Sequence, residues 1–257
     1  MTETLGSSAL RELVNLRDLG GIAVHGGHVR PGLVWRSDDA ACITADGAAA
    51  LVGRGLTSLI DLRSADELTF TGRGPLGTHQ VVHHHLPLLD ADASPFELSR
   101  MLETSGDTPL TVGAWYAQLA LERAEVLVAG LRVVAEAPGS VLFHCAAGKD
   151  RTGIFAAALL SALGASLEDI ATDYALTHTA MPQILARLAD RSRSWEPEGG
   201  LPTDGTSALL GAPAETMRHM LEVLDIDHGG FAAVLAAGGL DPRLRNDLVD
   251  RLVVETR

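Results

Sequence analysis

The sequence predicts an α/β fold with a short, mostly parallel central sheet, flanking helices and a helical C-terminal part. Three short runs, 58–62, 81–86 and 141–144, are predicted as strands, and the apolar residues 141–143 are suited to a buried one. Helical patterns precede the third run and follow it to the end of the chain. Strands that alternate with helices favour a parallel sheet. We expect a single domain over residues 1–257, because no linker or repeat divides the chain.

The N-terminal half is expected to hold the edge of the sheet and the first helices. Residues 16–34 are rich in glycine and apolar only in short bursts, which indicates edge strands and turns. Thr44 can cap a helix that runs to about Val52, before the next strand. Apolar residues at helical spacing over 113–136 predict one long helix.

The C-terminal half is expected to be helical. The predicted helices cover about 152–163, 167–178, 181–192, 214–224, 230–237 and 242–254. The first of these is an almost unbroken apolar run and should therefore be buried. Two segments are candidates for lids over a site: 90–110 mixes polar and large apolar residues as a helical flap would, and 192–211 has no periodicity. The alternative for each is a mobile surface loop.

The segment that carries chemistry is 144–153, His-Cys-Ala-Ala-Gly-Lys-Asp-Arg-Thr-Gly, between a strand and a buried helix. A loop that enters a helix N-terminus directs several N–H groups at one point, where the helix dipole adds positive charge. Cys145 can act there as a thiolate nucleophile, because N–H donors and a guanidinium stabilise a thiolate. Arg151 offers a planar fork of donors that matches two phosphoryl oxygens. The alternative is an inert core thiol beside a solvated arginine.

This loop resembles the HCxxGKDRTG phosphate loop of the bacterial atypical tyrosine and phosphoinositide phosphatases, within the Cys-based protein-tyrosine-phosphatase superfamily. Other segments that resemble the family, in the same order, are Asn15–Gly21, Arg30–Gly32, Trp35–Ser37, Ile60–Arg63 with Glu67, and 169–177. The resemblance implies the protein-tyrosine-phosphatase-like fold, one phosphatase catalytic domain and a phosphomonoesterase that needs no metal or other cofactor. Its substrate would be a phosphorylated protein or a phosphoinositide.

The resemblance also implies a role for each residue of the loop. Cys145 would attack phosphorus and form a cysteinyl-phosphate. The residues that would bind phosphate are Ala146, Ala147, Gly148, Lys149 and Arg151. The residues that would support them are His144, Thr152, Asp61, Arg17, Arg36 and Arg63. Among these, His144 would hold the loop, unless it is a buried histidine satisfied by backbone.

The general acid is less clearly defined, because the Trp-Pro-Asp segment of conventional tyrosine phosphatases is absent. Asp150 is the family's candidate, with Asp90 or Asp92 from the first aperiodic segment as the alternative. Neighbouring cations disfavour the protonated form of Asp150, whereas a bound phosphoryl dianion and a thiolate favour it. If Asp150 is not the acid, it is a structural partner for a neighbouring cation.

The formal net charge of −13 argues against nucleic acid, whose affinity depends on many Lys and Arg. An acidic protein with an anionic substrate must concentrate its cations, and the supporting arginines and Lys149 lie in segments that the resemblance brings together. For Arg36 and Arg63 the alternative is a surface ion pair. Lys149 adds a second cation, and Asp61 would lie at the pocket rim, where the family binds inositol head groups. Phosphoinositides are therefore candidate substrates, together with phosphotyrosine, phosphoserine and phosphothreonine. A soluble inositol-polyphosphate phosphatase and a non-catalytic pseudophosphatase are the further alternatives.

The remaining features give weaker indications. A metal site at His83–His85 is disfavoured, because a strand points His84 away from its two neighbours and no acidic shell is evident. The two cysteines are too few for a disulfide framework; Cys42 is expected to pack, although a protective disulfide with Cys145 is an alternative. No signal peptide or membrane span is evident, so a cytoplasmic location is expected. Nothing indicates the oligomeric state.

Overall fold

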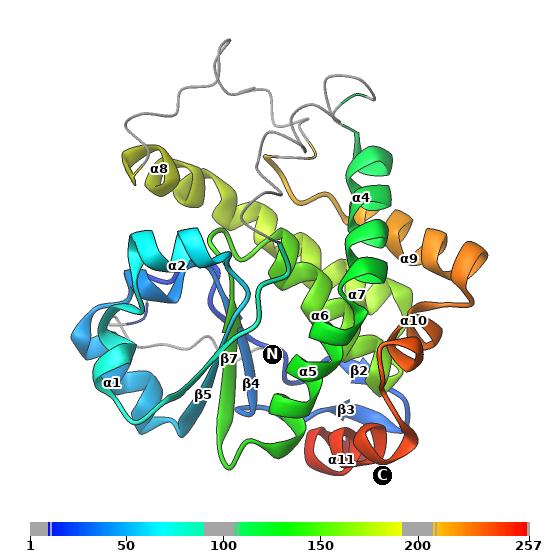
Figure 1. Cartoon of the computed structure of the whole chain (residues 1–257), viewed down its shortest axis with the longest axis horizontal. Helices are drawn as coiled ribbons and strands as arrows, with labels where there is room; N and C mark the ends of the chain where they lie inside the picture. The colour runs from blue at the N-terminus through cyan, green and yellow to red at the C-terminus, as the bar shows by residue number, and fades with distance from the viewer. Residues whose placement is uncertain are drawn as a thin grey trace.

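The computed structural model describes residues 10, 12–89, 106, 108–191, 208 and 210–255. Within them the chain forms the predicted α/β fold, a mostly parallel sheet with helices on both faces (Figure 1). The two candidate lids, 90–110 and 192–211, lie for the most part outside the described residues, so their role stays a prediction.

The central sheet has five strands in the order β1-β4-β7-β5-β6. The strands are β1 (Arg17–Asp18), β4 (Val34–Ser37), β5 (Leu56–Asp61), β6 (Val82–His85) and β7 (Ser140–His144). The last four pair in parallel, whereas β1 is an antiparallel edge strand. The three strands predicted at 58–62, 81–86 and 141–144 are therefore present, with β6 as a partly exposed strand at the edge of the sheet. The carboxyl ends of the parallel strands meet at one edge of the sheet, where open α/β sheets bind ligands.

The alternation of side chains along β5 and β7 divides the core into two layers. Leu59 and Leu142 pack on one face with helix α1 (Ala45–Gly53). Ile60 and Phe143 pack on the opposite face with the large helical cluster. Because both faces of the central strands are buried, these strands read as continuous apolar runs in the sequence.

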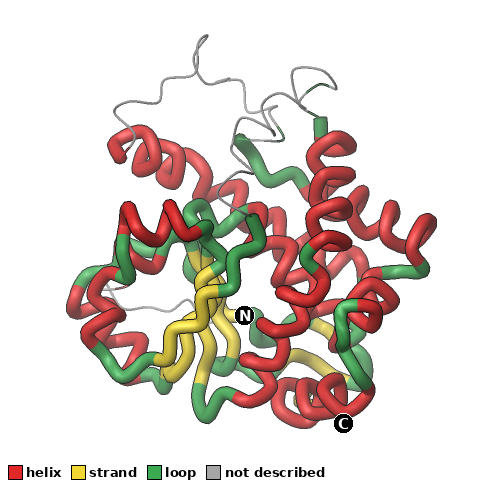
Figure 2. The backbone as a smooth tube through the Cα atoms, viewed as in Figure 1, coloured by secondary structure: helices red, strands yellow, loops and turns green. Residues whose placement is uncertain are grey.

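The helices that follow the sheet strands confirm most of the predicted pattern (Figure 2). They are α6 (Asp150–Leu163), α7 (Leu167–Ala175), α8 (Met181–Arg191), α9 (Ala214–His228), α10 (Phe231–Ala237) and α11 (Pro242–Leu252). A 3₁₀ turn, Leu176–Ala180, replaces the end of the helix predicted at 167–178. A helix not predicted from the sequence, α2 (Ala65–Thr71), begins with a capping box between Ser64 and Glu67.

The long helix predicted over 113–136 is wrong. The structure has two helices there, α4 (Pro109–Glu122) and α5 (Ala124–Glu136), and Arg123 leaves the helical conformation between them with φ −114° and ψ 20°. No glycine or proline marks this break, and apolar residues continue across it at helical spacing. The separation lets α4 pack along α9 while α5 packs against α10 and α11.

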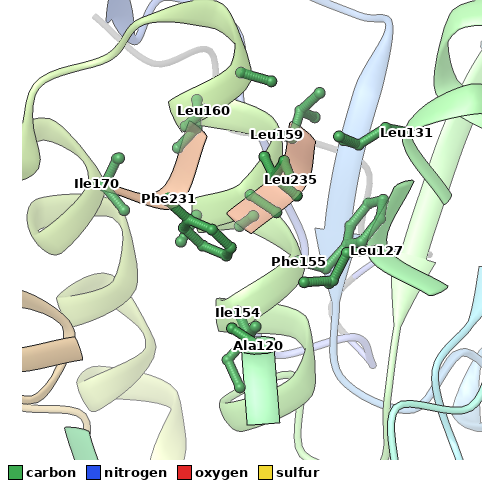
Figure 3. Packing of buried hydrophobic residues seen from close by; sticks show 14 of the residues in the cluster. Ala120, Leu127, Leu131, Ile154, Phe155, Leu159, Leu160, Ile170, Phe231 and Leu235 are labelled. Carbon is green, nitrogen blue, oxygen red and sulfur yellow. The ribbon is translucent and has the colours of Figure 1, made fainter. Parts of the chain in front are cut away.

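Helix α6 lies at the centre of the larger core (Figure 3). Apolar side chains from α5, α7 and α10 surround it, and Phe155 packs edge-on against Phe143 of β7 with ring centroids 4.8 Å apart. Gly130 of α5 is needed for this packing, because a Cβ there would lie 2.4 Å from the Phe155 ring. Each fully buried side chain of this size contributes about 1.5–3 kcal/mol, so α6 and the loop that precedes it are held firmly.

A second, antiparallel sheet joins the N- and C-terminal parts of the chain. It contains β2 (Ala23–Val24), β3 (Gly27–Val29) and β8 (Val253–Glu255), in that order. The helix predicted to run to Val254 therefore ends at Leu252. Gly27 permits the pairing, because a Cβ there would lie 2.0 Å from the Val254 carbonyl oxygen. In the described part of the chain, no helix is long and apolar enough to cross a bilayer.

Candidate active site

The candidate site is the loop between β7, which ends at His144, and α6, which begins at Asp150. Gly148 has φ +67° and turns the loop at a point where a Cβ would lie 2.4 Å from the Ser37 carbonyl oxygen. The backbone N–H of Gly148 donates to Sγ of Cys145 at 3.2 Å. Cys145 is buried, with 1% of its surface exposed. The loop therefore folds around the sulfur and directs a backbone donor at it, an arrangement that stabilises a thiolate.

Three donors outside the loop hold its carbonyl groups. The carbonyl oxygen of Gly148 accepts hydrogen bonds from Nδ2 of Asn15 at 2.9 Å and from the Arg36 guanidinium at 3.0 Å. The backbone N–H of Asp39 donates to the Ala146 carbonyl at 3.2 Å. On the outer side, Ala147 packs against the apolar face of α8. A loop held on all these sides needs little reorganisation when an anion binds.

Arg17 and Arg36 are directed at Asp173 of α7. Nε of Arg17 donates to Oδ1 of Asp173 at 2.8 Å, and Arg36 donates to Oδ2 at 2.5 Å. Burial alone would raise the pKa of Asp173, but the two guanidinium groups outweigh it and lower that pKa. Burial and the neighbouring Arg17 lower the pKa of Arg36 to about 10. The expectation that these arginines supply free positive charge to a cleft is therefore corrected: they form a buried ion-pair network beneath the loop.

The same correction applies to Arg63 and Asp61. Asp61 ends β5 with none of its surface exposed, and it accepts hydrogen bonds from Nε of Arg63 at 2.8 Å and from another Arg63 nitrogen at 2.5 Å. Burial opposes the charge of Asp61, but Arg63 and His83 lower its pKa. Asp61 therefore lies beneath the loop and cannot read a substrate at the pocket rim. Arg63 also reaches Asp39 at 3.1 Å, so its charge is neutralised inside the protein.

Arg151 is held by Glu67 of α2, a role that the sequence analysis did not identify. Both terminal nitrogens of Arg151 donate to the Glu67 carboxylate, one of them to Oε1 at 2.8 Å. Burial works against the guanidinium charge, but the hydrogen bonds to Glu67 and the nearby Cys145 raise the pKa of Arg151. The available signal was the Ser-x-x-Glu capping box that starts at Ser64. The capping box predicts where α2 starts, but it does not predict that Glu67 binds Arg151, 84 residues away in the sequence.

Asp150 lies at the start of α6 with 22% of its side chain exposed. Its Oδ1 accepts a hydrogen bond of 2.5 Å from the hydroxyl of Tyr116 on α4, and that hydroxyl lies 2.9 Å from the hydroxyl of Tyr174 on α7. No role for either tyrosine was predicted: Tyr116 lies on an apolar helix, and Tyr174 lies in the segment 169–177 that was named only for its resemblance to the family. The alternative acids, Asp90 and Asp92, lie outside the described residues.

Lys149 is almost fully buried, and its ammonium lies 3.3 Å from the Ala208 carbonyl oxygen and 3.1 Å from that of Gly211. It also lies 3.4 Å from Oδ1 of Asp150. These contacts differ from the expectation that the Lys149 side chain serves as a second phosphate-binding cation. They connect the loop to the chain segment that leads into α9.

The two supporting residues that flank the loop lie at its base. Nδ1 of His144 accepts from the backbone N–H of Ala40 at 3.2 Å, and burial lowers the pKa of this histidine, so it is neutral. Thr152 is fully buried, and its hydroxyl has no hydrogen-bond partner among the described residues. Cys42 and Cys145 are not joined in a disulfide, and the redox role considered for Cys42 stays a prediction.

No group of three or more His, Cys, Asp or Glu residues that could hold a metal ion occurs in the described ranges. His83 and His85 stack with ring centroids 6.3 Å apart, and Nε2 of His83 lies 3.2 Å from Asp61. The site thus combines a sulfur nucleophile, backbone donors, an anchored guanidinium and a carboxyl group at one helix N-terminus. This set of groups suits displacement at phosphorus with a covalent intermediate.

Comparisons with known proteins agree with this chemistry. A model of the tyrosine phosphatase family matches residues 8–254. The triple specificity protein phosphatase PtpB of Mycobacterium tuberculosis is 29% identical over 90% of this chain and 95% of its own. A tyrosine-protein phosphatase of Nostoc commune is 28% identical over 79% of this chain and 68% of its own. A Cupriavidus necator protein, provisionally named a tyrosine-protein phosphatase, is 32% identical over 70% of this chain and 68% of its own.

Proposed function

Since the chain belongs to the tyrosine phosphatase family and is a Cys-based phosphoric monoester hydrolase, we propose that it hydrolyses phosphotyrosine through a cysteinyl-phosphate on Cys145. The observation that carries the proposal is the donor at the sulfur: the Gly148 N–H lies 3.2 Å from Sγ of a buried Cys145. A buried thiol with a structural role would not require a loop of this shape, whose turn only glycine can occupy.

In the first step the thiolate of Cys145 attacks phosphorus in line with the tyrosyl oxygen. The S–P bond forms while the P–O bond to the leaving group breaks, and Asp150 transfers its proton to the departing oxygen. The loop amides and Arg151 bind the three equatorial oxygens, on which the charge of the transition state is spread. Glu67 keeps the guanidinium in place for this task.

In the second step water attacks the phosphorus of the cysteinyl-phosphate. Asp150, now a carboxylate, accepts a proton from that water, the S–P bond breaks, and the thiolate of Cys145 leaves with inorganic phosphate released. Thr152 supports this step, because its buried hydroxyl at the start of α6 has no other partner among the described residues and can donate to the departing sulfur. The enzyme returns to its starting protonation state.

We extend the proposal to phosphoserine, phosphothreonine and phosphoinositides as secondary substrates. The relative from M. tuberculosis is named a triple specificity phosphatase, which supports a broad range. A soluble inositol-polyphosphate phosphatase is disfavoured, because such a substrate needs free cations and Arg17, Arg36 and Arg63 are paired with carboxylates. A cytoplasmic location agrees with two cysteines that are not joined in a disulfide.

The test is hydrolysis of a phosphotyrosine peptide and of p-nitrophenyl phosphate in the presence of EDTA. The wild type should turn over both substrates, and Cys145→Ser should lose nearly all turnover while it still binds vanadate or phosphate. A wild-type protein that binds phosphate without turnover would be a pseudophosphatase. Activity of Cys145→Ser near the wild-type value would exclude the covalent mechanism. Activity that EDTA abolishes would indicate a metal-dependent route.

A further inference from the structure

We propose that Tyr116 is a positioning residue that fixes which oxygen of Asp150 carries the transferred proton, and that Tyr174 orients Tyr116. The inference rests on the proposed function, because it takes Asp150 as the general acid. Neither tyrosine touches the reacting atoms. Each would act through a hydrogen bond, from helices α4 and α7 that flank the N-terminus of α6 (Figure 1).

Proton counting sets the direction of the hydrogen-bond chain. Each tyrosine hydroxyl has one hydrogen to donate, and an ionised carboxylate can only accept. At 2.5 Å from Oδ1 of Asp150, the hydroxyl of Tyr116 must donate its hydrogen to that oxygen. The contact of 2.9 Å between the two hydroxyls is then a donation from Tyr174 to Tyr116. The chain therefore runs from Tyr174 through Tyr116 to Asp150.

The tyrosines keep these hydrogens at any working pH. Both are nearly or fully buried, with 0% of Tyr116 and 1% of Tyr174 exposed. Burial and the adjacent Asp150 carboxylate raise the pKa of Tyr116 well above its ordinary value, and burial does the same for Tyr174. The rings meet edge-on with centroids 6.0 Å apart, so packing also restricts their motion.

Within the described residues, both partners of the Asp150 carboxyl lie at the same oxygen. Tyr116 donates to Oδ1, and the Lys149 ammonium lies 3.4 Å from that same atom. Oδ2 has no hydrogen-bond partner among the described residues, while 22% of the side chain is exposed. Tyr116 can donate to Oδ1 in both protonation states, because Oδ1 is the carbonyl oxygen when Oδ2 carries the proton. The proton is thereby placed on Oδ2, the oxygen with no hydrogen-bond partner among the described residues, which leaves it available to a leaving group.

This arrangement makes a prediction about pH. The groups that face Asp150 are Tyr116 on α4, Tyr174 on α7, and Lys149 and Arg151 beside it. The hydrogen bond that Tyr116 donates is stronger to a carboxylate than to a neutral acid. Removal of the Tyr116 hydroxyl therefore favours the protonated form, and the alkaline limb of the pH–rate profile should move to higher pH. A purely structural role for Tyr116 would not move that limb.

The experiment compares Tyr116→Phe with the wild type on two substrates, phosphotyrosine and an activated aryl phosphate. Loss of a hydrogen bond to a charged group should lower phosphotyrosine turnover roughly tenfold, because the acid is no longer held toward the leaving oxygen. The activated ester needs little protonation and should slow less than about twofold. The matched variant Tyr174→Phe, which removes only the outer hydroxyl, should give an effect in the same direction but smaller.

Two further variants keep the result interpretable. Tyr116→Phe leaves the buried Tyr174 hydroxyl without its acceptor, so the double variant Tyr116→Phe/Tyr174→Phe, which removes both hydroxyls, controls for loss of stability. In an Asp150→Asn background, Tyr116→Phe should have no additional effect on phosphotyrosine turnover. If Asp150→Asn slows both substrates equally, the acid assignment of the proposed function fails. If Asp150→Asn is selective but Tyr116→Phe slows both substrates equally or leaves the alkaline limb in place, the positioning role is overturned.

Discussion

Glu67 is the residue whose replacement tests most directly how the guanidinium of the site is held. Its carboxylate accepts from both terminal nitrogens of Arg151 and also from the backbone N–H of Ser64 at 2.7 Å. Glu67→Gln preserves the size of the side chain and one acceptor oxygen, but it replaces the second acceptor with an NH₂ group. Arg151 would then keep one of its two hydrogen bonds to α2.

The expected magnitude follows from the hydrogen bond that is lost. A hydrogen bond to a charged group contributes about 1.5–3 kcal/mol, which corresponds to a factor of roughly 10 to 150. If Arg151 stabilises the transition state only in the orientation that Glu67 enforces, kcat should fall by about that factor. Affinity for phosphate should change much less, because removal of the Glu67 charge also reduces repulsion of the anion.

The assay is a measurement of kcat and KM on phosphotyrosine peptide, with a separate titration of inorganic phosphate as a competitive inhibitor. Asp66→Asn is the matched control, because Asp66 lies in the same first turn of α2, is exposed and changes the net charge equally. The control should leave kcat within about twofold. Wild-type kcat in Glu67→Gln would show that Arg151 is positioned without this ion pair. Equal losses in both variants would indicate a general effect of charge at α2.

Three other replacements test separate parts of the structure. Gly148→Ala should abolish activity and lower the free energy of unfolding, measured by urea titration, by more than about 2 kcal/mol, because the new Cβ meets the Ser37 carbonyl. The control is Gly21→Ala, where φ is also positive but the surrounding space is open; it should lower the free energy of unfolding by only about 1 kcal/mol. Lys149→Met should reduce hydrolysis of phosphotyrosine and of phosphoinositide by the same factor, since the ammonium bonds carbonyls; a loss confined to phosphoinositide would contradict this. Burial raises the pKa of Asp38 to about 6, so the native state binds more protons than the unfolded state between about pH 4 and 6. Stability should therefore fall by up to about 3 kcal/mol as pH rises through that window, and Asp38→Asn should remove this slope; an unchanged slope in unfolding titrations would refute the assignment.

The sheet and the loop could be predicted because their signals are local. Buried parallel strands are short apolar runs, and the loop at 144–153 stands between one such run and an apolar helix. The break at Arg123 could not be predicted in the same way, because neither glycine nor proline interrupts the apolar pattern there. The division is decided by the elements that α4 and α5 pack against, which the sequence does not show.

The partners of the site residues escaped the sequence analysis for a related reason. Glu67 lies 84 residues from Arg151, and Tyr116 lies 34 residues from Asp150. A glutamate at the third position of a helix predicts a capping box, and a tyrosine on an apolar helix face predicts core packing. Both local interpretations are correct in the structure, but each residue has an additional contact that only the three-dimensional arrangement reveals.

The same reasoning corrects the electrostatic picture of the site. Arg17 and Arg36 share Asp173, and Arg63 lies against Asp61. An isolated buried charge is costly, so a buried arginine needs a carboxylate partner, and each of these arginines has one. The arginines that surround the loop therefore add shape and rigidity to it, but little net positive charge.

Phosphate is then attracted by the backbone donors of the loop at the start of α6 and by the guanidinium of Arg151, which is itself paired with Glu67. Such a site attracts anions only at short range, while the whole chain carries a formal charge of −13. We therefore expect little salt dependence when sodium chloride is raised from about 0.05 M to about 0.3 M. The value of kcat/KM for a dianionic aryl phosphate should stay unchanged or rise up to about twofold, because the salt screens repulsion by the acidic surface. A steep decrease in kcat/KM would instead show that unpaired cations focus a positive field at the cleft.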